Sequence, residues 1–226
     1  MPALDDAQDA QKKAAGRHAA DYVADGMRVG LGTGSTVHWT TVALGERNAD
    51  ITCVATSDAT ERLAREVGLR VVGPVVESEL DIAVDGADEV DRDLNLVKGG
   101  GGAHTREKIV ASMAARFIVV VDETKLVDQL GRFGLPFEVL EFGVPLVTRR
   151  LDELGAKSFT PRDKLSDSGN PLYDADFFPI TDPAALAVGL QAIPGIVEHG
   201  IFPAAMVERV VIAGADGVRE MTATSR

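Results

Sequence analysis

Short apolar runs alternate with longer segments of helical periodicity over the first 130 or so residues. The apolar runs lie at 27–31, 51–55, 70–72, 80–84 and 117–121. Helical spacing of apolar residues fills most of the gaps, at 5–25, about 35–47, 58–67 and about 105–116. Strands of nearly continuous apolar character, separated by helices, predict a mostly parallel sheet that is covered by helices on both faces.

The pattern changes after Leu130, where glycine and proline become frequent. A strand at 137–142, a helix ending near Gly155, a strand at 172–180, a helix at 183–192 and a strand around Ile196 predict a small antiparallel α+β domain. The apolar run at 207–214 is expected to return to the first sheet. We therefore expect a doubly wound α/β domain of residues 1–131 plus 205–226, and a smaller α+β domain of residues 132–204.

Composition narrows the class of protein. The 226 residues carry a net charge of -12, which argues against a nucleic-acid partner because such a surface needs concentrated positive charge. No apolar run approaches the roughly 20 residues that a membrane span needs. The polar, acidic N-terminus lacks the pattern of a secretory signal, so we expect a cytoplasmic protein. Cys53, the single cysteine, lies in an apolar run and is expected to be a buried structural thiol.

The first candidate site is the sequence GLGTGSTV at residues 30–37. Its glycines allow backbone N–H groups to approach an anion, while Thr33, Ser35 and Thr36 offer hydroxyl groups at a helix N-terminus. Phosphate is the expected ligand, although a tight, capped strand-to-helix turn without any ligand would also explain the pattern. Val37 occupies the place of the third glycine of the dinucleotide motif, and the lysine of the Walker motif is absent. The sequence therefore argues against both a dinucleotide-binding loop and a Walker-type nucleotide-binding loop.

The second is DGADEVD at 85–91, which places Asp85 and Asp88 on a glycine-permitted turn after an apolar strand. Two such carboxylates could bind a metal or cap backbone donors. A metal is the weaker alternative, because the spacing is not that of a calcium loop and histidines are scattered. We expect no metal site. The histidines lie at positions 18, 38, 104 and 199.

The third is KGGGGAHTREK at 98–108, in which four glycines separate Lys98 from a helix that carries Glu107. Four glycines are costly to order, so a ligand is expected to approach this backbone closely. Glu107 could stabilise the first helical turn, act as a cap partner, or act as a base. A fourth segment, VVVDETKLV at 119–127, places Lys125 after a buried strand, where it could bind a ligand or simply be solvated.

In this order and spacing, the four segments resemble the signature loops of the A-type ribose-5-phosphate isomerase family. The family's motifs fall on 32–36, 85–88 and 98–107, and the stretches 136–139 and 192–197 are also similar. Two departures, Gly102 and His104, stand where the family more often has alanine and leucine. They spare every carboxylate and lysine of the motifs.

The resemblance implies a doubly wound α/β domain with a ferredoxin-like smaller domain, no cofactor, and a homodimer or homotetramer. It implies interconversion of ribose 5-phosphate and ribulose 5-phosphate through a cis-enediolate, in the non-oxidative branch of the pentose phosphate pathway. Glu107 would be the base and Lys98 would stabilise developing negative charge. Asp85 would open the furanose ring and Asp88 would orient sugar hydroxyls.

The substrate-binding residues implied by the same resemblance come from all four segments, with Lys12 as a weaker candidate. They are Thr33, Gly34, Ser35, Thr36, Asp85, Gly86, Ala87, Asp88, Lys98, Gly99, Gly100, Gly101 and Lys125. A related sugar-phosphate deaminase is an alternative, which the threonine-arginine-glutamate segment disfavours. A non-catalytic sugar-phosphate sensor is another, but the chain offers no DNA-binding module or basic face.

Overall fold

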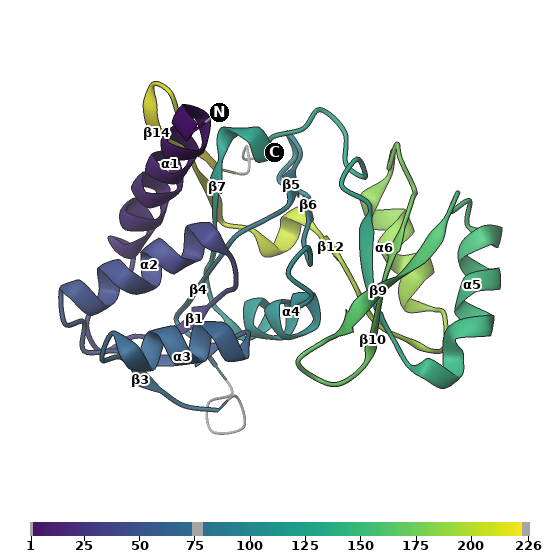
Figure 1. Cartoon of the computed structure of the whole chain (residues 1–226), viewed down its shortest axis with the longest axis horizontal. Coiled ribbons are helices and arrows are strands. Elements are labelled where there is room, and N and C mark those ends of the chain that lie inside the picture. Colours follow the sequence, from purple (N-terminus) through teal and green to yellow (C-terminus); the bar gives the residue numbers. More distant parts are fainter. Residues whose placement is uncertain (1, 74–78, 223–226) are drawn as a thin grey trace. The chain divides into compact units, whose positions relative to one another are not determined.

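The structure, a computed structural model, describes residues 2–73 and 79–222 and divides into two compact units (Figure 1). Unit 1 comprises Met1–Gly86, Arg106–Lys125 and Ala205–Arg226, and unit 2 comprises Ala87–Thr105 and Leu126–Ala204. Residues 87–105 and 126–131, which we expected in the larger domain, thus lie in unit 2. The physical reason is that two short strands of this segment, Glu89–Val90 and Leu96–Val97, belong to a small sheet that is separate from the large one.

Unit 1 is built on a seven-stranded sheet with the order β14-β13-β7-β4-β1-β2-β3. All neighbouring strands pair in parallel except β14, which forms an antiparallel hairpin with β13. The return of the chain to the first sheet is therefore confirmed. The strands are β1 (Arg28–Leu31), β2 (Thr52–Ala55), β3 (Arg70–Val71), β4 (Ile82–Asp85), β7 (Phe117–Asp122), β13 (Arg209–Gly214) and β14 (Gly217–Thr222).

Helices cover both faces of this sheet. The helices are α1 (Pro2–Ala20), α2 (Ser35–Glu46), α3 (Asp58–Glu66) and α4 (His104–Met113). The first three lie on one side, where Val29 and Leu31 of β1 enter the core (Figure 1). Gly30 faces the opposite side because side chains alternate along a strand. A Cβ at Gly30 would lie 2.4 Å from Val110 Cγ1 of α4, so glycine permits α4 to pack closely there.

Unit 2 holds a four-stranded antiparallel sheet with the order β11-β8-β10-β9. Its elements are β8 (Leu135–Val139), α5 (Val144–Glu153), β9 (Phe159–Leu165), β10 (Pro171–Ala175), α6 (Pro183–Gln191) and β11 (Ile196–His199). The buried side chains of Phe137, Leu151 and Leu190 join these layers. This strand-helix-strand-strand-helix-strand order is the ferredoxin-like arrangement. A second, three-stranded sheet combines β5 (Glu89–Val90), β6 (Leu96–Val97) and β12 (Ile201–Phe202).

The fold class is confirmed, and the differences are local. The strand expected at 137–142 is β8 and ends at Val139, while Phe142 lies fully exposed in a short 3-10 helix, Glu141–Gly143. The strand expected at 172–180 is β10 and ends at Ala175. We predicted no strand at the position of β9, because this edge strand carries mainly exposed residues.

Cys53 lies in β2 and is completely buried, as expected for a structural thiol. Burial raises the pKa of its thiol to about 12, because a low-polarity surrounding disfavours the thiolate. No helix in the described part of the chain is both long and apolar enough to cross a membrane.

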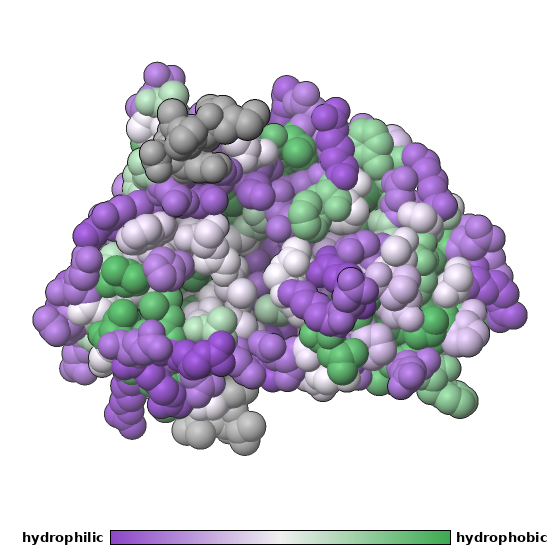
Figure 2. Space-filling model, in the orientation of Figure 1, coloured by the Kyte–Doolittle hydropathy of each residue, from purple (hydrophilic) through white to green (hydrophobic). Residues whose placement is uncertain are grey.

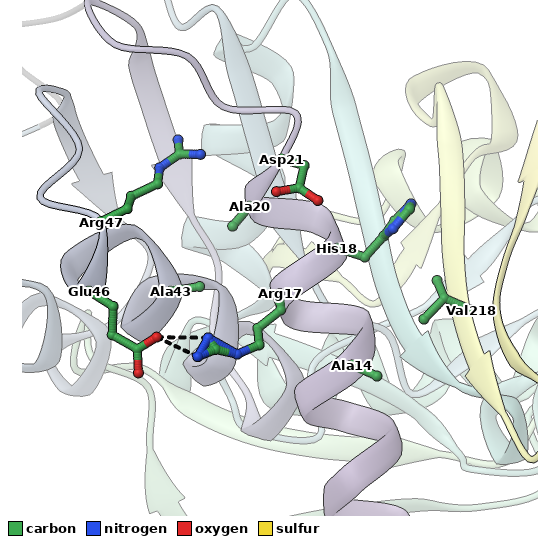
Figure 3. A pocket seen from close by; sticks show the side chains of 9 residues that line it. All are labelled: Ala14, Arg17, His18, Ala20, Asp21, Ala43, Glu46, Arg47 and Val218. Atoms are coloured by element: carbon green, nitrogen blue, oxygen red, sulfur yellow. Dashed lines mark hydrogen bonds and ion pairs between the residues drawn. The ribbon is translucent and has the colours of Figure 1, made fainter.

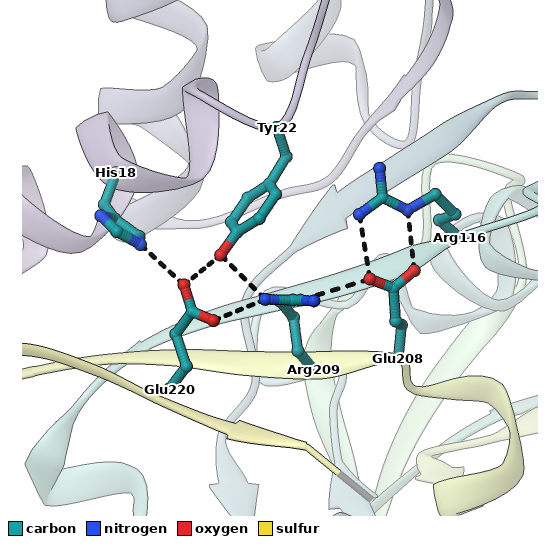
Figure 4. A network of polar contacts seen from close by, with 6 residues as sticks. All are labelled: His18, Tyr22, Arg116, Glu208, Arg209 and Glu220. Atoms are coloured by element: carbon teal, nitrogen blue, oxygen red, sulfur yellow. Dashed lines mark hydrogen bonds and ion pairs between the residues drawn. The ribbon is translucent and has the colours of Figure 1, made fainter.

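A polar network joins α1 and the residues after it to the β13–β14 hairpin (Figure 4). Its members are His18, Tyr22, Arg116, Glu208, Arg209 and Glu220. Glu220 accepts hydrogen bonds from the Tyr22 hydroxyl, from His18 Nε2 at 2.8 Å and from Arg209 Nη1 at 2.5 Å. The hydrogen bonds from Tyr22 and His18 lower the pKa of Glu220 to about 2.

This lowered pKa predicts that the folded protein loses stability in acid. Between an ordinary pKa of 4.5 and about 2, the unfolded chain binds a proton at Glu220 while the folded chain does not. The free energy of unfolding should therefore fall as pH decreases through this window, and the contribution should be fully present above it. Chemical denaturation at a series of pH values should show a shallower acid decline for Glu220→Gln. Glu66→Gln, an exposed residue of α3, should retain the wild-type slope, and equal slopes for all three proteins would contradict the prediction.

Candidate functional site

In unit 1, two of the candidate segments meet at one edge of the sheet. Strands β1 and β4 are parallel neighbours, so the loop after Leu31 and the carboxylate of Asp85 both lie at the carboxyl end of the sheet. Asp85 Oδ1 accepts the Thr33 N–H at 3.1 Å and the Gly86 N–H at 2.7 Å. Because Asp85 is 3% exposed, these two amides hold its carboxylate in a fixed orientation.

Gly32 is required by the close approach of this carboxylate. A Cβ at Gly32 would lie 2.0 Å from Asp85 Oδ1 and 2.6 Å from Asp85 Cβ. Neither atom can move away without breaking the contacts with Thr33 and Gly86. The loop and the carboxylate are therefore packed as one piece.

Gly32→Ala is expected to displace Asp85. Since this carboxylate is expected from the sequence to open the sugar ring, turnover should fall by about 10²-fold, the scale for a misplacement of roughly 1 Å. Steady-state kinetics will measure the loss. Gly73→Ala is the matched control, because no residue that the structure describes lies within 4 Å of a Cβ at Gly73. Turnover of Gly32→Ala equal to that of this control would contradict the prediction.

The N-terminus of α2 lies directly after the loop for which we expected an anion. The N-cap of this helix is Gly34, whose φ of 136° lies in the region that favours glycine. Without a side chain at the N-cap, the first amide groups of α2 can face a ligand. The loop is held from the β2 side, where Thr33 and Thr56 hydroxyls lie 2.8 Å apart and Thr60 donates to the Gly32 carbonyl at 2.9 Å.

A cavity of about 540 Å³ adjoins this loop. Thr33, Gly34 and Ser35 form part of its wall, and α2 and α3 supply most of the rest. Figure 2 shows apolar residues gathered over this part of unit 1, between α2 and α3, among more hydrophilic surroundings. The loop thus borders an open space large enough for a small ligand.

The remaining candidates of unit 1 lie on α4, near the end of β7 and on α1. Glu107 occupies the first turn of α4 and is 4% exposed, while its neighbour Arg106 pairs with Asp58 of α3 at 3.0 Å. Lys125 is half-buried in the 3-10 helix Glu123–Lys125, directly after β7. Lys12 lies on α1, with its Nζ 4.0 Å from Asp9.

In unit 2, the glycine-rich loop is attached to Asp88. Asp88 Oδ2 accepts the Gly100 N–H at 2.7 Å, and the peptide of Lys98 is fixed by a hydrogen bond from its N–H to the Gly200 carbonyl at 2.9 Å. The Lys98 side chain is 2% exposed, and its Nζ lies 5.3 Å from the centre of the Phe202 ring. A cation is therefore buried directly before the loop, partly against an aromatic face.

The candidates divide between the units, and two motifs contain a boundary, after Gly86 and after Thr105. Unit 1 holds Thr33, Gly34, Ser35, Thr36, Asp85, Gly86, Glu107 and Lys125. Unit 2 holds Ala87, Asp88, Lys98, Gly99, Gly100 and Gly101. The structure brings Asp85 together with Thr33 and Gly86, and Asp88 together with Gly100.

Two other features of the described residues do not join these candidates. A cavity of about 530 Å³ beside α1 and α2 contains Arg17, Arg47 and Glu46 but none of the expected site residues (Figure 3). Arg17 is engaged by Glu46 at 2.5 Å, and Arg47 donates to the Val23 carbonyl. Within residues 2–73 and 79–222, no three histidine, cysteine or acidic side chains gather in a way that could hold a metal ion.

Sequence reasoning missed the residues that support the glycine loop from β8 and β9. Glu138 of β8 is buried and accepts a hydrogen bond from Thr105 Oγ1 at 2.5 Å. Arg162 and Lys164 of β9 donate to loop carbonyls. The available signal in the sequence is their spacing of two residues, which places both side chains on one face of a strand.

The fold and these loops place the chain among α/β proteins that carry carboxylates and glycine-containing loops at the carboxyl ends of parallel strands. Residues 52–217 match the family model for ribose 5-phosphate isomerase A (phosphoriboisomerase A). The ribose-5-phosphate isomerase A of Roseiflexus sp. (strain RS-1) is 46% identical, over 95% of this chain and 96% of that protein. The chain therefore belongs to the ribose 5-phosphate isomerase A family, and it is an enzyme.

Solved structures agree with this assignment. The crystal structure of ribose 5 phosphate isomerase A from Neisseria gonorrhoeae matches with a TM-score of 0.93 and 34% identity, over 96% of this chain and 98% of that one. A D-ribose-5-phosphate isomerase in complex with phospho-erythronic acid matches with a TM-score of 0.90 and 37% identity, over 94% of this chain and 97% of that one.

One departure from the family pattern has a structural explanation. Gly102 has a φ of 86°, and a Cβ there would lie 2.6 Å from Leu172 Cδ1. The backbone conformation therefore favours glycine at this position, and a side chain there would also have to displace the end of the Leu172 side chain. His104, the other departure, packs beside Gly99.

Proposed function

We propose that Glu107 is the base of the reaction that this enzyme performs, the interconversion of ribose 5-phosphate and ribulose 5-phosphate. This reaction belongs to the non-oxidative branch of the pentose phosphate pathway. The observation that carries the proposal is a buried carboxylate in the first turn of α4, directly after the glycine-rich loop. Restricted water access suits a base that must return the same proton to its substrate.

The proton transfer proceeds on the open-chain sugar. Glu107 takes the proton from carbon 2, the electrons of that C–H bond form the double bond between carbons 1 and 2, and the carbonyl electrons move onto oxygen 1. The resulting cis-enediolate receives the proton at carbon 1, while the hydroxyl proton moves from oxygen 2 to oxygen 1. A carbonyl then forms at carbon 2, and all atoms and electrons are conserved.

The developing negative charge on oxygen requires positive charge and hydrogen-bond donors nearby. We assign this role to Lys98 and to backbone amides of Gly99, Gly100 and Gly101. A buried ammonium acts strongly because little water screens it. The relative that binds phospho-erythronic acid supports the assignment, since the planar carboxylate of a sugar acid resembles an enediolate in shape and charge.

The two aspartates take separate roles in the proposal. Asp85 moves the proton that opens the furanose ring, and Asp88 orients sugar hydroxyls with Ala87 and Gly86 lining the same turn. The amide bonds that orient Asp85 support this assignment, because ring opening needs a carboxylate in a fixed direction. The phosphate or another part of the substrate is bound by Thr33, Gly34, Ser35, Thr36 and Lys125, with Lys12 as a weaker contributor.

A coupled assay of ribulose 5-phosphate formation, in buffer that contains a chelator, tests the function. Wild type should remain active, because the proposed steps use only protein groups. Asp85→Asn should lose more activity on the cyclic sugar than on an acyclic substrate, whereas Asp88→Asn should lose similar activity on both. Equal losses for Asp85→Asn on the two forms would remove its ring-opening role, and inactive wild type would remove the function.

We place the enzyme in the cytoplasm as a homodimer or homotetramer. Membership of a carbohydrate-metabolising family supports the location. Exposed apolar side chains on unit 2, including Leu140, Phe142 and Val188, support self-association, because an interface that covered them would remove apolar surface from water. Light scattering on the protein as it elutes from a size-exclusion column will measure the mass of the oligomer.

A further inference from the structure

The guanidinium of Arg162 binds the glycine-rich loop from strand β9. Arg162 Nη1 donates to the Gly99 carbonyl at 2.7 Å and to the Gly100 carbonyl at 3.2 Å. The opposite edge of the guanidinium is held by Asp174 of β10, with Nε to Oδ2 at 2.8 Å and Nη2 to Oδ1 at 2.5 Å. Although β9 is an edge strand with mostly exposed residues, this side chain is only 13% exposed.

The peptide between Gly99 and Gly100 connects Arg162 to Asp88. In a trans peptide the carbonyl and the N–H point in opposite directions. Here the carbonyl of Gly99 accepts from Arg162, and the N–H of Gly100 donates to Asp88 Oδ2 at 2.7 Å. A single rigid plane therefore lies between a cation and a carboxylate, and any rotation of this plane would weaken both hydrogen bonds.

The packing leaves this peptide little freedom once Arg162 is bound. A Cβ at Gly100 would lie 2.6 Å from Asp88 Oδ1 and 2.8 Å from Phe133 Cζ, so Asp88 and Phe133 enclose the backbone. Lys164, two residues along β9, donates to the Gly101 carbonyl at 2.7 Å. Successive loop carbonyls thus face cations of β9, and the Gly100 N–H faces Asp88.

We propose that Arg162 is a positioning residue for Asp88 and acts through the Gly99–Gly100 peptide. The inference rests on the proposed role of Asp88 in holding the sugar. A hydrogen bond from a charged donor to the carbonyl polarises the peptide, which strengthens the bond from the N–H to Asp88. Lysine cannot replace Arg162 fully, because it lacks the planar fork that binds Asp174 and two carbonyls together.

A double-mutant cycle on ribose 5-phosphate tests the proposal. Asp88→Asn and Arg162→Ala should each lower kcat/KM by about 10-fold or more, and the double variant should lose little beyond Asp88→Asn, because the two act through one connection. Arg162→Lys should fall between wild type and Arg162→Ala. Millimolar guanidinium should restore part of the activity of Arg162→Ala and none of that of Asp88→Asn.

Arg150→Ala is the matched control, since Arg150 is exposed on α5 of the same unit and pairs with Glu153, three residues along the same helix. It should keep wild-type kinetics and show no response to guanidinium. Thermal unfolding will verify that each variant is folded. If Arg162→Ala does not fold, Arg162→Lys and Asp174→Asn take its place in the cycle, and both should show the same non-additive loss.

The outcomes separate this inference from the function on which it rests. Losses that multiply in the double variant, or wild-type kcat/KM for Arg162→Ala beside an impaired Asp88→Asn, would overturn the positioning role alone. Full activity of Asp88→Asn would refute the role assigned to Asp88 and therefore the reason for positioning it. Inactive wild type would overturn the proposed function itself.

Discussion

Glu107→Gln is expected to lose about 10³-fold or more in kcat, near the upper range for removal of a general base. Glutamine keeps the size and hydrogen-bonding shape of the side chain, but it cannot accept the proton from carbon 2. Substrate binding should change little, because the amide still fills the buried position on α4. The loss should therefore appear in kcat rather than in KM.

Two measurements test this expectation. The coupled assay measures turnover, and the disappearance of deuterium from carbon 2 of a labelled substrate, whether to carbon 1 or to water, measures proton removal directly. Both should fall together in Glu107→Gln. Glu66→Gln, which alters an exposed carboxylate of α3, should match wild type in both. Rapid deuterium loss by Glu107→Gln would show that another group removes the proton.

The second large effect is expected for Lys98→Met, which should lower kcat by roughly 10²- to 10³-fold, the scale for loss of one group that stabilises an oxyanion. Methionine preserves much of the hydrocarbon volume beside Phe202 and removes only the positive charge. Because Lys98 is 2% exposed, water cannot replace that charge at close range.

Lys157→Met provides the control for Lys98→Met. Lys157 is an exposed lysine of the same unit, and its Nζ donates to the Phe178 carbonyl at 2.6 Å. Its replacement should leave kcat near the wild-type value, and thermal unfolding should show that both variants fold. A small loss for Lys98→Met, comparable with that for Lys157→Met, would contradict the charge-stabilising role.

Much of unit 1 could be predicted from the sequence because its strands carry unbroken apolar runs. Phe117–Asp122 is buried along its whole length, and β1, β2 and β4 are nearly as apolar. A strand that is buried on both faces is apolar at nearly every position, and such a run is easily recognised in the sequence. The glycine-rich loops were equally visible, since close approach to a backbone excludes side chains at specific positions.

The strands that were missed have no recognisable pattern of apolar residues. β5, β6 and β12 are two residues long, too short for any periodicity to appear. β9 presents a polar, exposed row, which is indistinguishable from a loop in a single sequence. The partners of the glycine loop were hidden for the same reason: Arg162 is distant in sequence from Gly99, and only the pairing of β9 with β10 places its guanidinium beside Asp174.

Unit 1 is interrupted in the sequence by unit 2, and this order affects how the chain folds during translation. β13 pairs with β7 in parallel, yet nearly the whole of unit 2 is translated between them. A ribosome must therefore synthesise the inserted unit before β7 acquires its second neighbour. Until then β7 exposes an unpaired apolar edge, and such edges attract other chains. Early folding of unit 2 would draw the two distant strands closer and shorten that vulnerable interval.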